Sequence, residues 1–130
     1  MVGLEDLVVS GQEMDKQLVA EILAPFVKLD KDSISIRPTG AWNGLNNDQK
    51  IIVYLIARKA MLALGFKIDN EPAKASEIVA DTGVKRGTAH PALRKMLDKR
   101  LIEQSKDGKY YVPNWAIPSL NSVLGNKKTE

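Results

Sequence analysis

Basic side chains are concentrated in one stretch of this 130-residue sequence. Residues 84–113 hold eight lysine and arginine residues against three acidic residues, a net charge of +5. Residues 1–32 hold seven acidic residues against three lysines, a net charge of −4. Lysine and arginine donate hydrogen bonds to phosphate groups and to the O6 and N7 atoms of guanine. The asymmetry indicates one face for a polyanion and a separate face for another partner, although a basic run can also be a solvated helix face.

Part of this basic stretch, from about 86 to 99, has the apolar spacing of a helix. The apolar face consists of Ala89, Leu93, Met96 and Leu97. The outward positions are Gly87, Thr88, Pro91, Arg94, Lys95, Asp98 and Lys99. Pro91 is compatible with a helix whose N-cap is Thr88, because an N–H at the third helical position has no intrahelical acceptor to lose. His90 lies near the edge of the apolar face, where packing is favoured over base reading.

Two neighbouring elements must hold this basic helix in place. A short helix over 76–81, capped by Ser76, runs into Thr82-Gly83-Val84, where the glycine supplies the left-handed backbone of a tight turn. After the basic helix, a hairpin is expected over 102–112, with the two-residue turn Asp107-Gly108. The order of elements is therefore helix, tight turn, basic helix and hairpin.

The segment Gly87-Thr88-Ala89-His90-Pro91-Ala92-Leu93, with its continuation through Arg94 and Lys95 to Leu101-Ile102, resembles the winged helix-turn-helix superfamily. It is most similar to the recognition helix of PadR- and MarR-type transcriptional regulators. The resemblance covers about residues 47–112 and implies a mainly α fold with short β-strands. It also implies a homodimer that binds double-stranded DNA sequence-specifically, with helix 86–99 in the major groove and wing 102–112 on the backbone. Arg100 stands where these families often carry glycine, so the helix end is either less tight or mildly strained.

The candidate DNA contacts are Lys74, Ser76, Lys85, Arg86, Gly87, Thr88, Pro91, Arg94, Lys95, Lys106 and Lys109. Arg94 and Lys95 can donate to guanine or to phosphate. Gly87 and Pro91 add little bulk, so the backbone can approach the groove, and Pro91 can touch a thymine methyl group. Thr88 can join the free N–H groups at the helix start in holding a phosphate. Lys106 and Lys109 flank the hairpin turn and can contact the backbone or the minor groove, and Lys74 and Ser76 can contact phosphate from the start of the preceding helix. The alternative for each basic side chain is plain solvation.

The first part of the chain lies outside this resemblance. We expect a helix over 11–24 that Pro25 ends, and then a hairpin whose strands include 27–29 and 34–36. A further helix begins at the capping box formed by Asn46 and Gln49 and ends near Leu64, before Gly65. That helix is apolar nearly all round, so the first 45 residues or a second subunit must cover it. The predicted units are an N-terminal helix–hairpin extension (1–45), a winged helix-turn-helix domain (46–112), a C-terminal helix (113–124) and a frayed tail (125–130).

The composition argues against several kinds of site. The sequence has no cysteine and one histidine, so it offers no disulfide, no thiol-ligated zinc and no multi-histidine metal site. No nucleophile–base set and no glycine-rich phosphate loop is recognisable, so we expect neither enzyme activity nor a cofactor. The first residues do not resemble a secretory signal and the longest apolar stretch is too short to span a bilayer, so we expect a cytoplasmic protein without membrane contact. The alternative function is a winged-helix protein-interaction module in a larger complex, with the N-terminal region as its candidate protein-binding surface.

Overall fold

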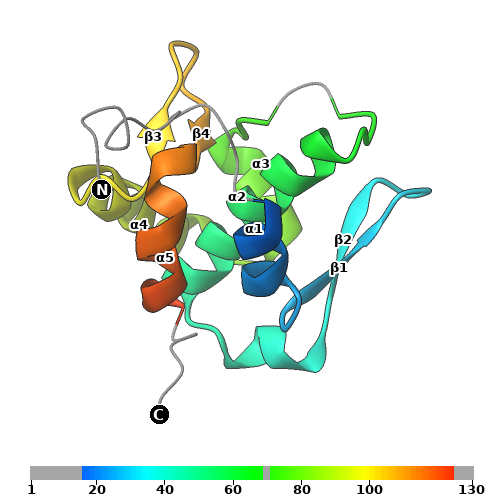
Figure 1. Cartoon of the computed structure of the whole chain (residues 1–130). Coiled ribbons are helices and arrows are strands. Elements are labelled where there is room, and N and C mark those ends of the chain that lie inside the picture. Colours follow the sequence, from blue (N-terminus) through cyan, green and yellow to red (C-terminus); the bar gives the residue numbers. More distant parts are fainter. Residues whose placement is uncertain (1–15, 69–70, 125–130) are drawn as a thin grey trace, which may run out of the picture.

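The computed structural model describes residues 16–68 and 71–124 and has mainly helices with two short antiparallel hairpins (Figure 1). The helices are α1 (Lys16–Leu23), α2 (Asn47–Ala63), α3 (Ala75–Thr82), α4 (Arg86–Asp98) and α5 (Ile117–Val123). The strands are β1 (Val27–Asp30), β2 (Ser35–Pro38), β3 (Glu103–Gln104) and β4 (Tyr110–Tyr111). The described part of the chain also contains the 3₁₀ turns η2 (Gly40–Gly44) and η3 (Asn114–Ala116). The expected class, mainly α with short β, is confirmed.

Helix α2 forms the centre of the molecule. Residues 51–57 are each at most 2% exposed, so this helix is buried on every side. Helices α1, α3 and α4 pack around it. The expected cover from the first 45 residues is therefore confirmed for α1, and α3 and α4 supply the rest. A second subunit is not needed to cover this part of the helix.

Both ends of α2 follow from its sequence. The Asn46 side chain accepts from the Gln49 backbone N–H, and the Gln49 side chain accepts from the Asn46 N–H, both at 2.9 Å, so the predicted capping box is confirmed. The two bonds satisfy N–H groups that have no acceptor within the helix. After the last turn, Gly65 has a φ of +84°, the left-handed conformation expected of a glycine that ends a helix.

The N-terminal hairpin forms as predicted, but its second strand begins at Ser35, so Ile34 lies in the turn and not in the predicted strand 34–36. Helix α1 begins at Lys16, and the earlier part of the predicted helix, 11–15, lies outside the described residues. Strands β1 and β2 pair antiparallel, with Leu29 opposite Ile36. Asp30 accepts from the backbone N–H groups of Asp32 and Ser33 and from Arg37 Nε at 2.7 Å. The Ser33 N–H and then the Arg37 side chain lower the pKa of Asp30 to about 2, so the carboxylate stays charged and closes the loop.

The second hairpin differs from the prediction at its turn. Ser105 N–H donates to the Lys109 carbonyl at 2.7 Å, so three residues, 106–108, form the loop instead of the predicted pair Asp107-Gly108. Gly108 has a φ of +81° and donates to the Ser105 carbonyl, the geometry of a type I turn followed by a left-handed residue. Ala73 pairs with Tyr110 as an isolated bridge, which ties the segment before α3 to this hairpin.

The C-terminal part packs on the same core. The predicted helix over 113–124 is divided into η3 and α5, and Ala116, Ile117 and Leu120 are each at most 1% exposed. The predicted frayed tail, 125–130, lies outside the described residues.

None of the helices in residues 16–68 and 71–124 combines the length and the apolar character that crossing a membrane requires.

A buried ion pair joins α2 to the segment before α3. Lys59 is 7% exposed, and its Nζ lies 2.8 Å from Glu71 Oε2. Changing Glu71→Gln leaves the ammonium buried without a counter-charge, and we expect the free energy of unfolding to fall by about 3–5 kcal/mol. The double variant Lys59→Met, Glu71→Gln removes both charges and should recover much of this loss. Urea unfolding measures all three proteins, and a Glu71→Gln variant as stable as the parent would contradict the prediction.

Candidate nucleic-acid interface

Helix α4, Arg86–Asp98, agrees with the predicted extent of about 86–99. Its N-cap is Lys85, and Thr88 and Ala89 both donate to the Lys85 carbonyl, so the alternative N-cap at Thr88 is wrong. Pro91 therefore lies inside the helix, where its nitrogen cannot donate to the Gly87 carbonyl four residues earlier. Gly87 is exposed, so water or a bound molecule can reach that carbonyl group. Pro91 thus removes the usual intrahelical donor to the Gly87 carbonyl on the outer side of α4.

The outer face of α4 is the predicted one. The buried residues of the helix are Ala89, Ala92, Leu93 and Met96. The exposed ones include Gly87, Thr88, Pro91, Arg94 and Lys95, as expected. His90 is also exposed, so the expectation that it packs against the core is wrong. The centre of the buried face lies between Ala92 and Leu93, whereas the prediction centred it on Leu93. At about 100° per residue, this shift places His90 on the exposed side of the helix.

The connection from α3 to α4 is built as a tight turn. Gly83 has a φ of +80°, and Val84 is 3% exposed between the helices. The Thr82 hydroxyl donates to the Ile78 carbonyl at 2.6 Å and accepts from the Val84 N–H at 3.1 Å. These bonds satisfy backbone groups at the end of α3, so the turn fixes the direction in which α4 leaves it.

The start of α3 corrects one of the predicted roles. The N-cap is Lys74, whose backbone N–H donates to Glu77 Oε1 at 2.8 Å, so the predicted cap at Ser76 is wrong. Glutamate three residues after the cap is the residue type that satisfies this N–H. Ser76 lies exposed in the first helical turn, and Lys74 is exposed beside it. Both remain accessible to a ligand.

Two of the candidate lysines already have acidic partners. Lys95 Nζ lies 2.6 Å from Asp48 Oδ2 in the first turn of α2, and the two side chains are 53% and 29% exposed. Lys109 Nζ lies 3.6 Å from Asp107 Oδ2 in the second hairpin, where the Lys109 side chain is 20% exposed. The Ser105 hydroxyl donates to Asp107 and, with a smaller contribution from Lys109, lowers the pKa of that carboxyl group. Neither lysine therefore presents an isolated positive charge.

The other basic candidates are uncommitted. Among the described residues, the side chains of Lys85, Arg86, Arg94 and Lys106 make no hydrogen bond or ion pair, and all four are exposed. Arg94 lies on the outer face of α4, and Lys106 lies in the loop of the hairpin that projects at the top of Figure 1. Arg100, which follows α4, has a φ of +61°, so the strained alternative for the helix end is confirmed.

A shallow groove extends this face toward α2. It has a volume of about 400 Å³ and is lined by Asn46, Asn47, Asp48, Thr88, Pro91, Ala92 and Lys95. Sequence reasoning missed the contribution of α2, although Asn46 was recognised as a helix cap. The sequence signal for this contribution was the predicted start of α2, because the first backbone N–H groups of a helix have no intrahelical acceptor and favour an anion. Asp48 opposes that preference, because it places a negative charge in the groove.

The site stands on this geometry alone. No protein-family model, curated protein or solved structure matches the chain. Within residues 16–68 and 71–124, no cluster of three or more histidine, aspartate and glutamate side chains is placed to hold a metal ion. The arrangement offers an exposed helix with uncommitted cations, a small-residue surface at Gly87 and Pro91, and a groove beside it.

Replacing Gly87 tests whether the fold of α4 requires glycine at this exposed position. It has no positive φ, and a Cβ atom built on it would meet nothing within 4 Å, so neither conformation nor packing requires glycine there. Glycine in a helix is less stable than alanine by about 0.5–1 kcal/mol. We expect Gly87→Ala to raise the melting temperature by a few degrees in thermal unfolding. A lower melting temperature would show that glycine is needed for the fold.

Proposed function

We propose that the protein binds double-stranded DNA sequence-specifically as a transcriptional regulator, with α4 as the recognition helix. The observation that carries the proposal is the outer face of α4, where the uncommitted Arg94 shares one exposed face with Gly87 and Pro91 on a helix anchored by its buried side. A rigid helix with small residues and free guanidinium donors suits close approach to the major groove. The proposal is of a binding protein without catalytic activity.

The order of the elements supports a winged helix-turn-helix domain. Helix α2 is followed by the Ala73 bridge, α3, the Gly83 turn, α4 and the β3–β4 hairpin. In a winged helix, the helix after the tight turn enters the major groove and the hairpin contacts the backbone. Here Lys106 in the hairpin loop would contact phosphate, because it is exposed and uncommitted. Lys109 would contribute less, because Asp107 partly neutralises it.

The candidate contacts divide by the chemistry of their side chains. Arg94 would read guanine, and Pro91 would touch a thymine methyl group. Lys85, Arg86 and the start of α4 with Thr88 would hold phosphate groups. Lys74 and Ser76, at the start of α3, would contact the backbone in the same way. Lys95 is the least available base contact, because its ammonium is already paired with Asp48.

A homodimer remains part of the proposal. A two-fold axis would present two copies of α4 to half-sites about one helical turn apart. Leu62 and Leu64 at the end of α2 are 44% and 64% exposed, and Trp115 is 53% exposed. Large exposed apolar side chains are common at contacts between chains.

The same exposed side chains favour the second candidate function, a protein-interaction module. A protein partner held by Trp115 or Leu64 would be bound mainly through apolar contact. Binding of that kind depends weakly on salt, whereas each neutralised phosphate makes DNA affinity fall with rising salt. The salt dependence of affinity therefore distinguishes the two functions.

Reversing the charge of Arg94 tests DNA binding. We expect Arg94→Glu to lose most of the affinity for duplex DNA selected from random sequence, because a major-groove donor becomes an anion. The matched control is Lys31→Glu, which makes the same charge change at the exposed tip of the N-terminal hairpin. Gel-shift titration at several salt concentrations measures both variants. Equal binding by Arg94→Glu and the parent protein would exclude α4 as the reading element.

Neutralising Asp48 should act in the opposite direction. We expect Asp48→Asn to tighten DNA binding, because it releases Lys95 and removes a negative charge from the groove beside α4. The salt dependence should steepen by about one counterion, which is the increment for one further phosphate contact. Fluorescence anisotropy with labelled duplex measures both quantities. Weaker binding by this variant, with unfolding unchanged, would mean that DNA does not lie over the groove.

A further inference from the structure

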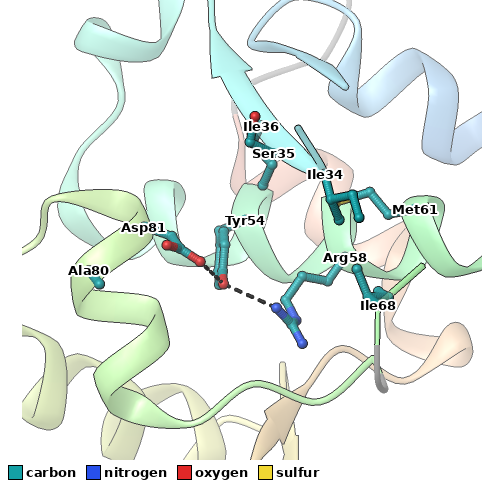
Figure 2. A pocket seen from close by; sticks show the side chains of 9 residues that line it. All are labelled: Ile34, Ser35, Ile36, Tyr54, Arg58, Met61, Ile68, Ala80 and Asp81. Atoms are coloured by element: carbon teal, nitrogen blue, oxygen red, sulfur yellow. Dashed lines mark hydrogen bonds between the residues drawn. The ribbon is translucent and has the colours of Figure 1, made fainter. Parts of the chain in front are cut away.

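A second cavity lies apart from α4, between the N-terminal hairpin, α2 and α3 (Figure 2). Its volume is about 270 Å³. None of the candidate DNA contacts lines it, so the proposed function does not account for it. At about 30 Å³ for each water molecule, the cavity has room for a ligand the size of about nine waters.

One side of the cavity is polar and carries both signs of charge. Tyr54 Oη donates to Asp81 Oδ2 at 2.5 Å, and Arg58 Nη1 donates to Tyr54 Oη at 3.3 Å. Burial, and then the bond to Asp81, raise the pKa of Tyr54 far above its usual range, so the hydroxyl between the two charged groups stays neutral. Asp81 Oδ1 makes no hydrogen bond with another described residue. One carboxylate oxygen of this lining residue is therefore unpaired among the described residues.

The other side of the cavity is aliphatic. It is formed by Ile34, Ile36, Met61 and Ile68. In Figure 2, Ile34, Met61 and Ile68 gather on the side of Tyr54 away from Asp81. The aliphatic walls come from the hairpin, from α2 and from the segment before α3, so three separate parts of the chain meet on this side of the cavity. A ligand that fits both sides needs an apolar body and a charged head.

Ile34 supplies an independent observation. It has a φ of +52°, a left-handed conformation that a β-branched residue rarely adopts. It is also 38% exposed, so the strained residue gains little from the hydrophobic core. Glycine or asparagine would form this loop without strain. Strained residues cluster at ligand-binding sites, and the side chain of Ile34 lines the cavity.

We propose that this cavity binds a small α-amino acid with an aliphatic side chain. The ammonium group of the ligand donates to Asp81 Oδ1, and its carboxylate faces the positive charge of Arg58. The positive charge of Arg58 attracts the ligand carboxylate without a hydrogen bond between them. Arg58 therefore keeps its contacts with the carbonyl groups of Glu71 and Pro72, at 2.8 and 3.3 Å. The aliphatic side chain packs against Ile34, Met61 and Ile68. A zwitterion complements a site that holds one carboxylate and one guanidinium.

Titration with L-leucine, followed by NMR on the full chain without DNA, tests this site independently of the proposed function. We expect saturable chemical-shift changes at Ile34, Tyr54 and Asp81. 3-Methylbutylamine lacks the carboxylate and 4-methylpentanoate lacks the ammonium group, and each should bind at least about tenfold more weakly. Equal binding of leucine and either analogue would overturn the proposal. So would the absence of saturation with leucine up to its solubility limit.

Three variants complete the test. Asp81→Asn should weaken leucine binding at least about tenfold, since a neutral amide holds an ammonium group less well than a carboxylate. Ile34→Gly relieves the backbone strain, so it should unfold at an equal or higher temperature while binding leucine more weakly. Asp98→Asn removes an exposed carboxylate from α4 and should leave leucine binding unchanged. Full leucine affinity in both cavity variants, or an equal loss in the Asp98 control, would place the binding elsewhere.

Discussion

The burial of α2 on every side is the constraint on which the rest of the structure depends. Residues 51–57 form a continuous apolar surface around the helix, and such a surface is stable only when other elements cover it completely. Helices α1, α3 and α4 do so from different directions. Val19 and Ile22 of α1, and Trp42 after the first hairpin, lie in the same hydrophobic cluster as α4. The described N-terminal part is therefore integral to the core that positions α4.

Polar contacts then fix each element against this central helix. Lys59 pairs with Glu71 before α3, Tyr54 donates to Asp81 at the end of α3, and Asp48 pairs with Lys95 on α4. Apolar packing holds elements together without specifying one orientation, whereas a hydrogen bond or ion pair is made only in a narrow geometry. Successive turns of α2 thus contribute to the groove beside α4, to the second cavity and to the buried ion pair.

Local sequence patterns predicted much of the fold. The capping box at Asn46, the left-handed turn at Gly83, the N-terminal hairpin and the buried face of α4 each depend on residues close together in the chain. Local patterns failed to predict the start of a helix where two nearby positions could each begin it. Thr88 is a good helix cap, yet α4 starts at Arg86, since the tight turn and the packing of Ala89 and Ala92 set the register. For the same reason, the predicted edge position of His90 became an exposed one.

The sequence by itself determined the class of the fold, the central apolar helix and the face of α4 that carries Arg94, because apolar periodicity and backbone preferences act within a few residues. Only the tertiary structure decided which of those charges are available. Asp48 is 47 positions from Lys95 in the chain, and no local pattern relates them, yet the packing of α4 on α2 brings their side chains to 2.6 Å. The cavity beside Tyr54 has the same origin. Its walls are distant in sequence, and only the tertiary structure brings them around one space.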